Sequence, residues 1–110
     1  MASDAGTIDY LLDQLRSGGI DATAKKMFGE YGLYVDGKMA AMVCDDQLFV
    51  KAVPGTTATL EGFERAPPYP GAKPHPRIDG DRWENADWLG DLFRITAAEL
   101  PSPKPKKAKA

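Results

Sequence analysis

The stretch that decides the fold is residues 27–51, which read MFGEYGLYVDGKMAAMVCDDQLFVK. Asp36-Gly37 separates two runs of alternating apolar residues, and Asp-Gly is favoured in two-residue type I′ hairpin turns because both central residues need a positive φ. Asp45-Asp46 separates the second run from a third and predicts another two-residue turn. The stretch therefore predicts three antiparallel strands joined by two tight turns.

These turns predict a register for the strands. The expected pairs are Val35 with Lys38, Tyr34 with Met39, Leu33 with Ala40, Val43 with Leu48 and Met42 with Phe49. Because successive residues of a strand point to opposite faces, the register predicts one covered and one open face. The covered face is expected to carry Tyr34, Met39, Ala41, Val43, Leu48 and Val50. The open face is expected to carry Tyr31, Leu33, Val35, Lys38, Ala40, Met42, Cys44, Gln47, Phe49 and Lys51.

The open face is apolar in its middle, with lysines at its rim. Leu33, Met42 and Phe49, together with Tyr31, would form a sizeable apolar patch, and such patches usually mark a contact surface. We expect this interaction face to bind a protein partner or a second copy of the chain, because a two-fold dimer uses the same patch twice.

Periodic apolar residues predict helices on both sides of the strands. Ile8, Leu11, Leu12 and Leu15 share one face of a helix over about 8–17, capped by Thr7 and ended by Gly18-Gly19. A short turn over 21–26 leads into the first strand. A second long helix is expected to begin between 81 and 85 and to end near Glu99, with Trp83 and Trp88 packing around it.

Between the third strand and the last helix, we expect a short helix near 56–63 and then a loop over 66–76. That loop has five prolines, which remove donors from a strand ladder and exclude it from a central strand. Arg77-Ile78-Asp79 predicts a short edge strand that pairs back onto the meander.

The expected fold class is α+β: a two-layer sandwich in which an antiparallel meander with a short edge strand packs against N-terminal and C-terminal helices. A length of 110 residues fits one domain over 1–100 followed by a disordered Lys/Pro-rich tail over 101–110. No apolar run is long enough to cross a membrane and the N-terminus has no signal-peptide pattern, so we expect a cytoplasmic protein.

Charge is unevenly distributed along the chain. The net charge is −2, but the tail carries four lysines and no acid, which leaves 10 basic against 16 acidic residues in the rest. Clustered lysine and arginine provide most nucleic-acid affinity. A nucleic-acid contact would therefore be expected only through Lys104, Lys106, Lys107 and Lys109.

Candidate chemistry is sparse. One cysteine and one histidine give no metal-ligand motif, and no phosphate loop or cofactor motif is present. Cys44 with His75 is the one conceivable nucleophile and base pair, although we expect Cys44 to pack in a strand and His75 to fix a loop. Lys51, Tyr69, Lys73 and His75 form a second candidate, an anion or ligand site beside the proline loop.

Two segments resemble the N-terminal domain of the TfoX/Sxy family. They are KMFGEYGLYVDGKMAAMVCDDQLFVKA at 26–52 and YPGAKPHPRID at 69–79, and with the closing helix the resemblance spans about 7–100. It implies a secretion-chaperone-like α+β fold and a link to natural competence, in which full-length members act as transcriptional co-activators alongside a cyclic-AMP receptor protein. It supplies no catalytic residues. Those regulators carry a second, helical domain where this sequence has its lysine tail, so the resemblance is to a stand-alone N-terminal domain.

The leading functional expectation is a non-catalytic regulatory or protein-interaction module. The alternatives are a nucleic-acid-associated protein that uses the basic tail, and a small ligand-binding protein or enzyme with its site around Cys44 and His75.

Overall fold

The structure, a computed structural model, describes residues 5–27, 30–68 and 70–100. Its described residues form a six-stranded antiparallel sheet in the order β1-β2-β3-β4-β6-β5, with helices on one face. The strands are β1 (Ala22–Met27), β2 (Glu30–Val35), β3 (Lys38–Cys44), β4 (Gln47–Val50), β5 (Arg65–Ala66) and β6 (His75–Ile78). The helices are α1 (Ala5–Ser17), the 3-10 helix η1 (Pro54–Thr56), α2 (Gly80–Trp83) and α3 (Ala86–Glu99). This confirms the predicted α+β class.

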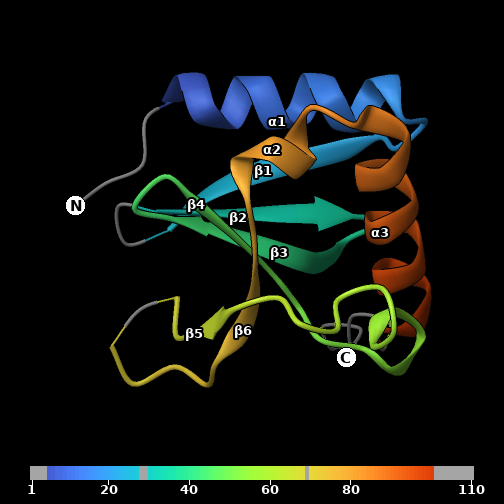
Figure 1. The fold of residues 1–110 in the computed structure, drawn as a ribbon. Helices are drawn as coiled ribbons and strands as arrows, with labels where there is room; N and C mark the ends of the chain where they lie inside the picture. Colours follow the sequence, from blue (N-terminus) through green and yellow to red (C-terminus); the bar gives the residue numbers. More distant parts are fainter. Residues whose placement is uncertain (1–4, 28–29, 69, 101–110) are drawn as a thin grey trace, which may run out of the picture.

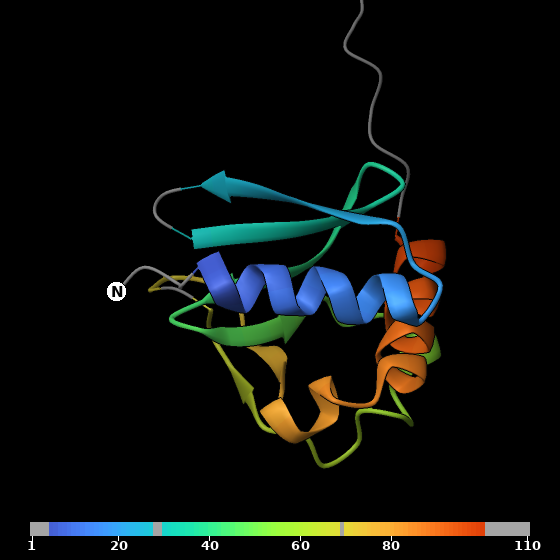
Figure 2. The same cartoon turned by 90° about the horizontal axis from the view of Figure 1, so that it is seen from above.

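Two helices enclose the core against the sheet. Figure 1 shows α1 running along the sheet and α3 standing at one end of it, while Figure 2 shows α1 lying over the middle of the curved sheet. Fully buried residues from both helices and from the sheet meet in one cluster. Its largest members include Leu11, Leu15, Leu33, Leu48, Leu89 and Phe93.

Both predicted turns are present. Asp36 and Gly37 have φ angles of 54° and 79°, and Asp45 and Asp46 have 54° and 58°, as a type I′ turn requires. Asp46 also accepts a hydrogen bond from Thr7 of α1, with 3.1 Å between Thr7 Oγ1 and Asp46 Oδ1. The second turn therefore forms without glycine, and it is tied to the first helix.

The predicted register is confirmed for the strand pairs next to the two turns and is wrong for the β2–β3 pairs beyond Tyr34 and Met39. Tyr34 pairs with Met39 as expected, but Leu33 pairs with Ala41 and not with Ala40. Ala40 is therefore the extra residue of a β-bulge, and its carbonyl accepts a hydrogen bond from the Lys51 amide at 2.9 Å. A shift of one residue moves side chains to the other face.

The bulge makes the predicted faces partly wrong. Leu33 is 0% exposed in the main core, and Tyr31 packs against that core, as do Val35 and Ala40. Met39, predicted on the covered face, packs instead with the residues of the other face. The predicted interaction face of Leu33, Met42, Phe49 and Tyr31 is therefore split between the two sides of the sheet.

What remains on the other side is buried as well. Met42 and Phe49 are 5% and 3% exposed and form a small cluster with Cys44, against which Met39 and Ala66 pack. The predicted exposed patch is therefore wrong. Among the large hydrophobic side chains of the described residues, Tyr10 is the exposed one, at 41%.

The ends of the elements also correct several expectations. The turn predicted over 21–26 is strand β1, and α1 begins at Ala5, so Thr7 lies inside that helix. The helix predicted near 56–63 is limited to η1, with turns after it, and the predicted edge strand is β6, which lies inside the sheet because β5 flanks it. The last helix is interrupted before Asn85, which caps α3 by accepting a hydrogen bond from the Trp88 amide at 3.0 Å.

Candidate functional site

The most distinctive surface group lies where α2 meets α3. The guanidinium carbon of Arg82 is 4.9 Å from the ring centroid of Phe63 and 5.1 Å from that of Trp88. The two rings are stacked, with centroids 6.1 Å apart and planes 11° apart. We name Phe63, Arg82 and Trp88 the Arg82 cluster. Cation–π contacts of this kind hold the guanidinium in place while its donors stay accessible.

Several hydrogen bonds fix the backbone that carries this cluster. Trp83 Nε1 donates to the Ile78 carbonyl at 2.9 Å, and the Trp83 carbonyl accepts from Gln14 Nε2 of α1 at 2.7 Å. The Asn85 cap then sets the first turn of α3, where Trp88 lies. The cluster therefore combines Phe63 of the segment before β5, Arg82 of the short α2 and Trp88 of α3, and these hydrogen bonds tie α2 and the start of α3 to the rest of the fold.

A polar cleft of about 380 Å³ adjoins the cluster. It is lined by Glu61, Gly62, Phe63, Glu64, Arg77, Asp79 and Arg82. The two arginines in it differ. Arg77 is held by Glu64 at 2.5 Å and by Asp79 at 3.3 Å, and the hydrogen bond and charge of Glu64 raise the pKa of its guanidinium above the usual range. Arg82 is exposed and forms no ion pair with a carboxylate of the described residues, so it can bind an external acceptor.

A second, smaller cleft borders the cluster through Trp88. It encloses about 200 Å³ and is lined by Thr56, Thr59, Trp88, Asp91, Leu92 and Ile95. The Arg82 cluster therefore lies between a polar and a more apolar depression. This mixed character is typical of surfaces that bind other proteins, where tryptophan and arginine are enriched.

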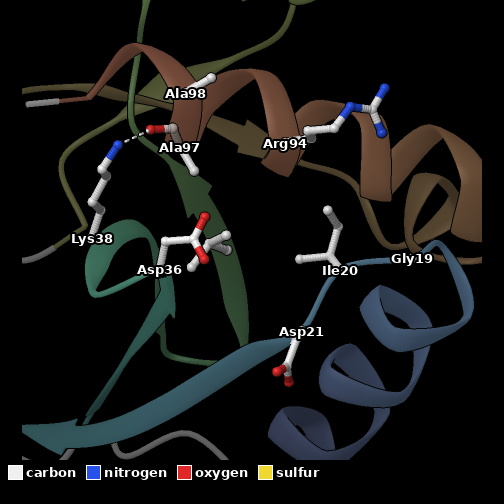
Figure 3. A pocket seen from close by; sticks show the side chains of 9 residues that line it. Gly19, Ile20, Asp21, Asp36, Lys38, Arg94, Ala97 and Ala98 are labelled. Carbon is white, nitrogen blue, oxygen red and sulfur yellow. Dashed lines mark hydrogen bonds between the residues drawn. The ribbon is translucent and has the colours of Figure 1, made fainter. Parts of the chain in front are cut away.

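A third cleft, of about 360 Å³, lies between the α1–β1 connection, the β2–β3 turn and the end of α3 (Figure 3). Ile20 and Asp36 point into it, while Asp21 and Arg94 point away. Lys38 Nζ donates to the Ala97 carbonyl at 2.9 Å, which ties the turn to the last turn of the helix. The Lys38 ammonium therefore already has a hydrogen-bond acceptor within the protein.

The structure separates Cys44 from His75. Cys44 of β3 pairs with Gln47 of β4, and Phe49 of β4 pairs with Arg77 of β6. When this register is continued, His75 lies four residues beyond the level of Cys44 along the strands, and β6 lies two strands away from β3. At ordinary strand spacings this is about 13 Å along and about 10 Å across the strands. A nucleophile and its base must come within about 3 Å.

Each group of this pair already has a place in its own surroundings. Cys44 is 5% exposed, and burial, followed by the negative charge of Glu30, raises the pKa of its thiol. His75 Nδ1 donates to the Lys73 carbonyl at 2.7 Å, which is the loop-fixing role expected for it. The structure therefore does not bring Cys44 and His75 together as the nucleophile and base considered above, and Cys44 packs in a strand as expected.

The predicted anion loop is only partly described. Tyr69 lies outside the described residues, as do Lys104, Lys106, Lys107 and Lys109 of the tail. Lys51 is half-buried and Lys73 is exposed, and none of the three clefts above includes either of them. The positions of Lys51 and Lys73 therefore add no support for an anion or ligand site beside the proline loop.

The described part of the chain has neither a metal centre nor a membrane helix. No three of its His, Cys, Asp and Glu residues are grouped to hold an ion. Its helices are too short or too polar to cross a bilayer.

Sequence reasoning missed Arg82 altogether and treated Trp88 as a packing residue. Trp88 does pack against the core, as predicted, and so does Trp83. Phe63 precedes Arg82 by 19 residues, and Arg82 precedes Trp88 by 6. No single helix or strand brings residues at these separations together. Only the return of the chain from β6 into α2 assembles them.

Comparison with known proteins agrees with the fold. Residues 13–100 match the TfoX N-terminal domain family. An uncharacterized 12.7 kDa protein encoded in the trpE 5′ region of Spirochaeta aurantia is 41% identical over 109 residues, which cover 99% of this chain and 93% of that protein. The match covers the turns, the bulged sheet and the closing helix, and the chain belongs to the TfoX N-terminal domain family.

Proposed function

We propose that this chain is a non-catalytic regulatory module that works by binding another protein, with the Arg82 cluster as the centre of the contact. The observation that carries the proposal is the placement of an exposed guanidinium, without an ion pair among the described residues, on two stacked aromatic rings. Buried aromatic and arginine anchors provide most of the binding energy of typical interfaces. The separation of Cys44 from His75 removes the best candidate for catalysis.

Family membership supports a regulatory role. The TfoX/Sxy resemblance implies co-activation of transcription beside another regulator, which is an activity based on protein contact. The partner expected here presents a carboxylate to Arg82 and an apolar group to the cleft beside Trp88, because those are the complements of the two depressions.

Site-specific crosslinking in the native host tests this proposal. A photoreactive amino acid at Glu61, which lines the polar cleft, should form a discrete adduct, whereas the same group at Tyr10 on α1 should not. The captured protein, once purified, should bind the wild-type chain and bind Arg82→Glu at least about tenfold more weakly.

Arg16→Glu is the matched control because Arg16 is another exposed arginine and the charge change is identical. It should leave binding unchanged. An adduct at Glu61 that survives Arg82→Glu, or equal adducts at Glu61 and Tyr10, would count against the proposal.

A second candidate function rests on the sequence of the tail. Its four lysines without an acid favour nucleic-acid binding that weakens steeply with salt. Deleting 101–110 should then abolish a mobility shift with duplex DNA, whereas Arg82→Glu should not. A shift that persists without the tail would exclude this role.

A further inference from the structure

Strand β1 ends the sheet on the side opposite β5 and β6. It pairs with β2 alone in the described sheet, and Figure 2 shows the β1–β2 hairpin beyond α1 at one margin of the molecule. Every second residue of an edge strand directs its N–H and C=O groups away from its neighbour. The outer edge of β1 can therefore accept a further strand.

The charges along this edge are self-complementary. Asp21 lies directly before β1 and Lys25 lies near its end, with the small residues Ala22, Thr23 and Ala24 between them. In an antiparallel pair of identical strands, the acidic start of one copy meets the basic end of the other. A register with Thr23 opposite Thr23 places Asp21 of each copy directly opposite Lys25 of the second copy.

The side chains of Asp21, Thr23 and Lys25 are exposed at this edge. Lys25 Nζ lies over the Tyr34 ring, 5.2 Å from its centroid, on the sheet face away from the helices. Thr23 and Asp21 are exposed, and Figure 3 shows the Asp21 carboxylate pointing away from the nearby cleft. Opposite charges and paired threonines directly across two strands both stabilise a sheet.

We propose that two copies of this chain pair antiparallel through β1, with Thr23 on the two-fold axis and Asp21 of each copy opposite Lys25 of the other. The two sheets then continue into one. A single strand pair buries less surface than a standard stable interface, so association depends on protein concentration. This surface is separate from the Arg82 cluster.

Exposed lysines on an edge strand often prevent such pairing. The two possibilities make opposite predictions for charge reversal. If Lys25 prevents pairing, then Lys25→Asp leaves the chain monomeric or promotes association. If Lys25 is part of the contact, then reversing it places two aspartates opposite each other.

Sedimentation velocity over a concentration series decides between them. The full-length wild type should show reversible dimers, and Asp21→Lys or Lys25→Asp should each weaken dimerisation by about tenfold or more, because each reverses two cross-strand pairs. The double variant Asp21→Lys/Lys25→Asp should restore it. Lys26→Asp is the control: it makes the same charge change on the neighbouring residue, which lies opposite the uncharged Ile20 in this register.

Cysteine crosslinking provides a test that does not depend on the charge variants. In a Cys44→Ala background, Thr23→Cys should form an intermolecular disulfide with a mild oxidant such as copper phenanthroline, because directly opposite Cα atoms are about 4.5–5.5 Å apart. Lys26→Cys should not, because its two copies would lie about 20 Å apart. The proposal is overturned if the wild type is monomeric at every concentration. It is also overturned if a dimer forms that neither charge reversal weakens and that Thr23→Cys does not crosslink. Arg82→Glu should leave the dimer intact.

Discussion

Gly18 at the end of α1 and Gly90 in α3 meet backbone to backbone. A Cβ atom added at Gly90 would lie 2.6 Å from the Gly18 carbonyl oxygen, and one added at Gly18 would meet the Ala86 carbonyl. The crossing of the two helices over the core therefore needs glycine at both positions. The hydrogen bond from the Ile20 amide to the Leu15 carbonyl, at 2.8 Å, closes α1 in a Schellman motif just beyond this contact.

Gly90→Ala is expected to destabilise the protein by about 1–3 kcal/mol, since the helices must separate to admit the methyl group. This exceeds the roughly 1 kcal/mol that alanine gains over glycine inside a helix. Chemical denaturation monitored by circular dichroism measures the change. Gly80→Ala is the control, because a Cβ there meets nothing within 4 Å, and an equal loss in both variants would contradict the role of the crossing.

Leu33→Ala is expected to lower the free energy of unfolding by about 2–5 kcal/mol, since the bulge places Leu33 in the main core and a cavity remains there. Tyr10→Ala removes a larger but exposed side chain and should have a much smaller effect. Urea midpoints for both variants provide the comparison. Similar midpoints would mean that Leu33 does not lie in the core.

Asn85→Ala is expected to cost about 1 kcal/mol, because the Trp88 amide loses its capping acceptor. Asn85→Asp retains an acceptor and places a negative charge at the helix start, so it should keep most of the stability. Thermal unfolding of both variants tests the cap. A larger loss for the aspartate variant than for the alanine variant would be inconsistent with it.

Thr96→Val is expected to stabilise the protein by about 1–3 kcal/mol. Thr96 is 0% exposed, and its Oγ1 has no hydrogen-bond partner among the described residues, so folding buries a hydroxyl without compensation. Valine has the same shape without the hydroxyl. Thr59→Val, at an exposed position, should change the unfolding midpoint little, and a destabilised Thr96→Val would show that the hydroxyl is satisfied in solution.

Cys44 is expected to make stability depend on pH in the alkaline range. Because burial raises the pKa of its thiol in the folded state, the folded chain holds that proton more tightly than the unfolded chain does. Its contribution is complete below the ordinary thiol pKa of about 8.5 and is lost as pH rises through the higher folded value. Unfolding free energies of wild type and Cys44→Ala measured between about pH 7 and 10 should therefore diverge, with the wild type losing more. Parallel curves would contradict this.

Alkylation of the thiol provides an independent check. Native Cys44 should react slowly with iodoacetamide at pH 8 and quickly after unfolding, because both burial and the low thiolate fraction protect it. Fast reaction in the native state would show that the small cluster around Met42 and Phe49 opens readily.

The sequence by itself determined the turns, the two long helices and the fold class. Asp36-Gly37 and Asp45-Asp46 impose left-handed backbone angles on their own residues, and the apolar period of α1 depends only on neighbours within two turns. The pairs next to each turn follow directly, because a two-residue turn leaves one register open to the strands. These features are local, so the residue pattern contains them.

Only the tertiary structure decided which faces the strands present and where a site is assembled. Nothing in the apolar run around Ala40 marks the bulge, and a single extra residue there moved Leu33 into the core and removed the predicted interaction face. Strand β1, rich in alanine and lysine, has little strand propensity and forms because β2 offers it a partner. The Arg82 cluster joins residues from two separate segments, and its contacts depend on how β6, α2 and α3 pack, which no sequence spacing specifies.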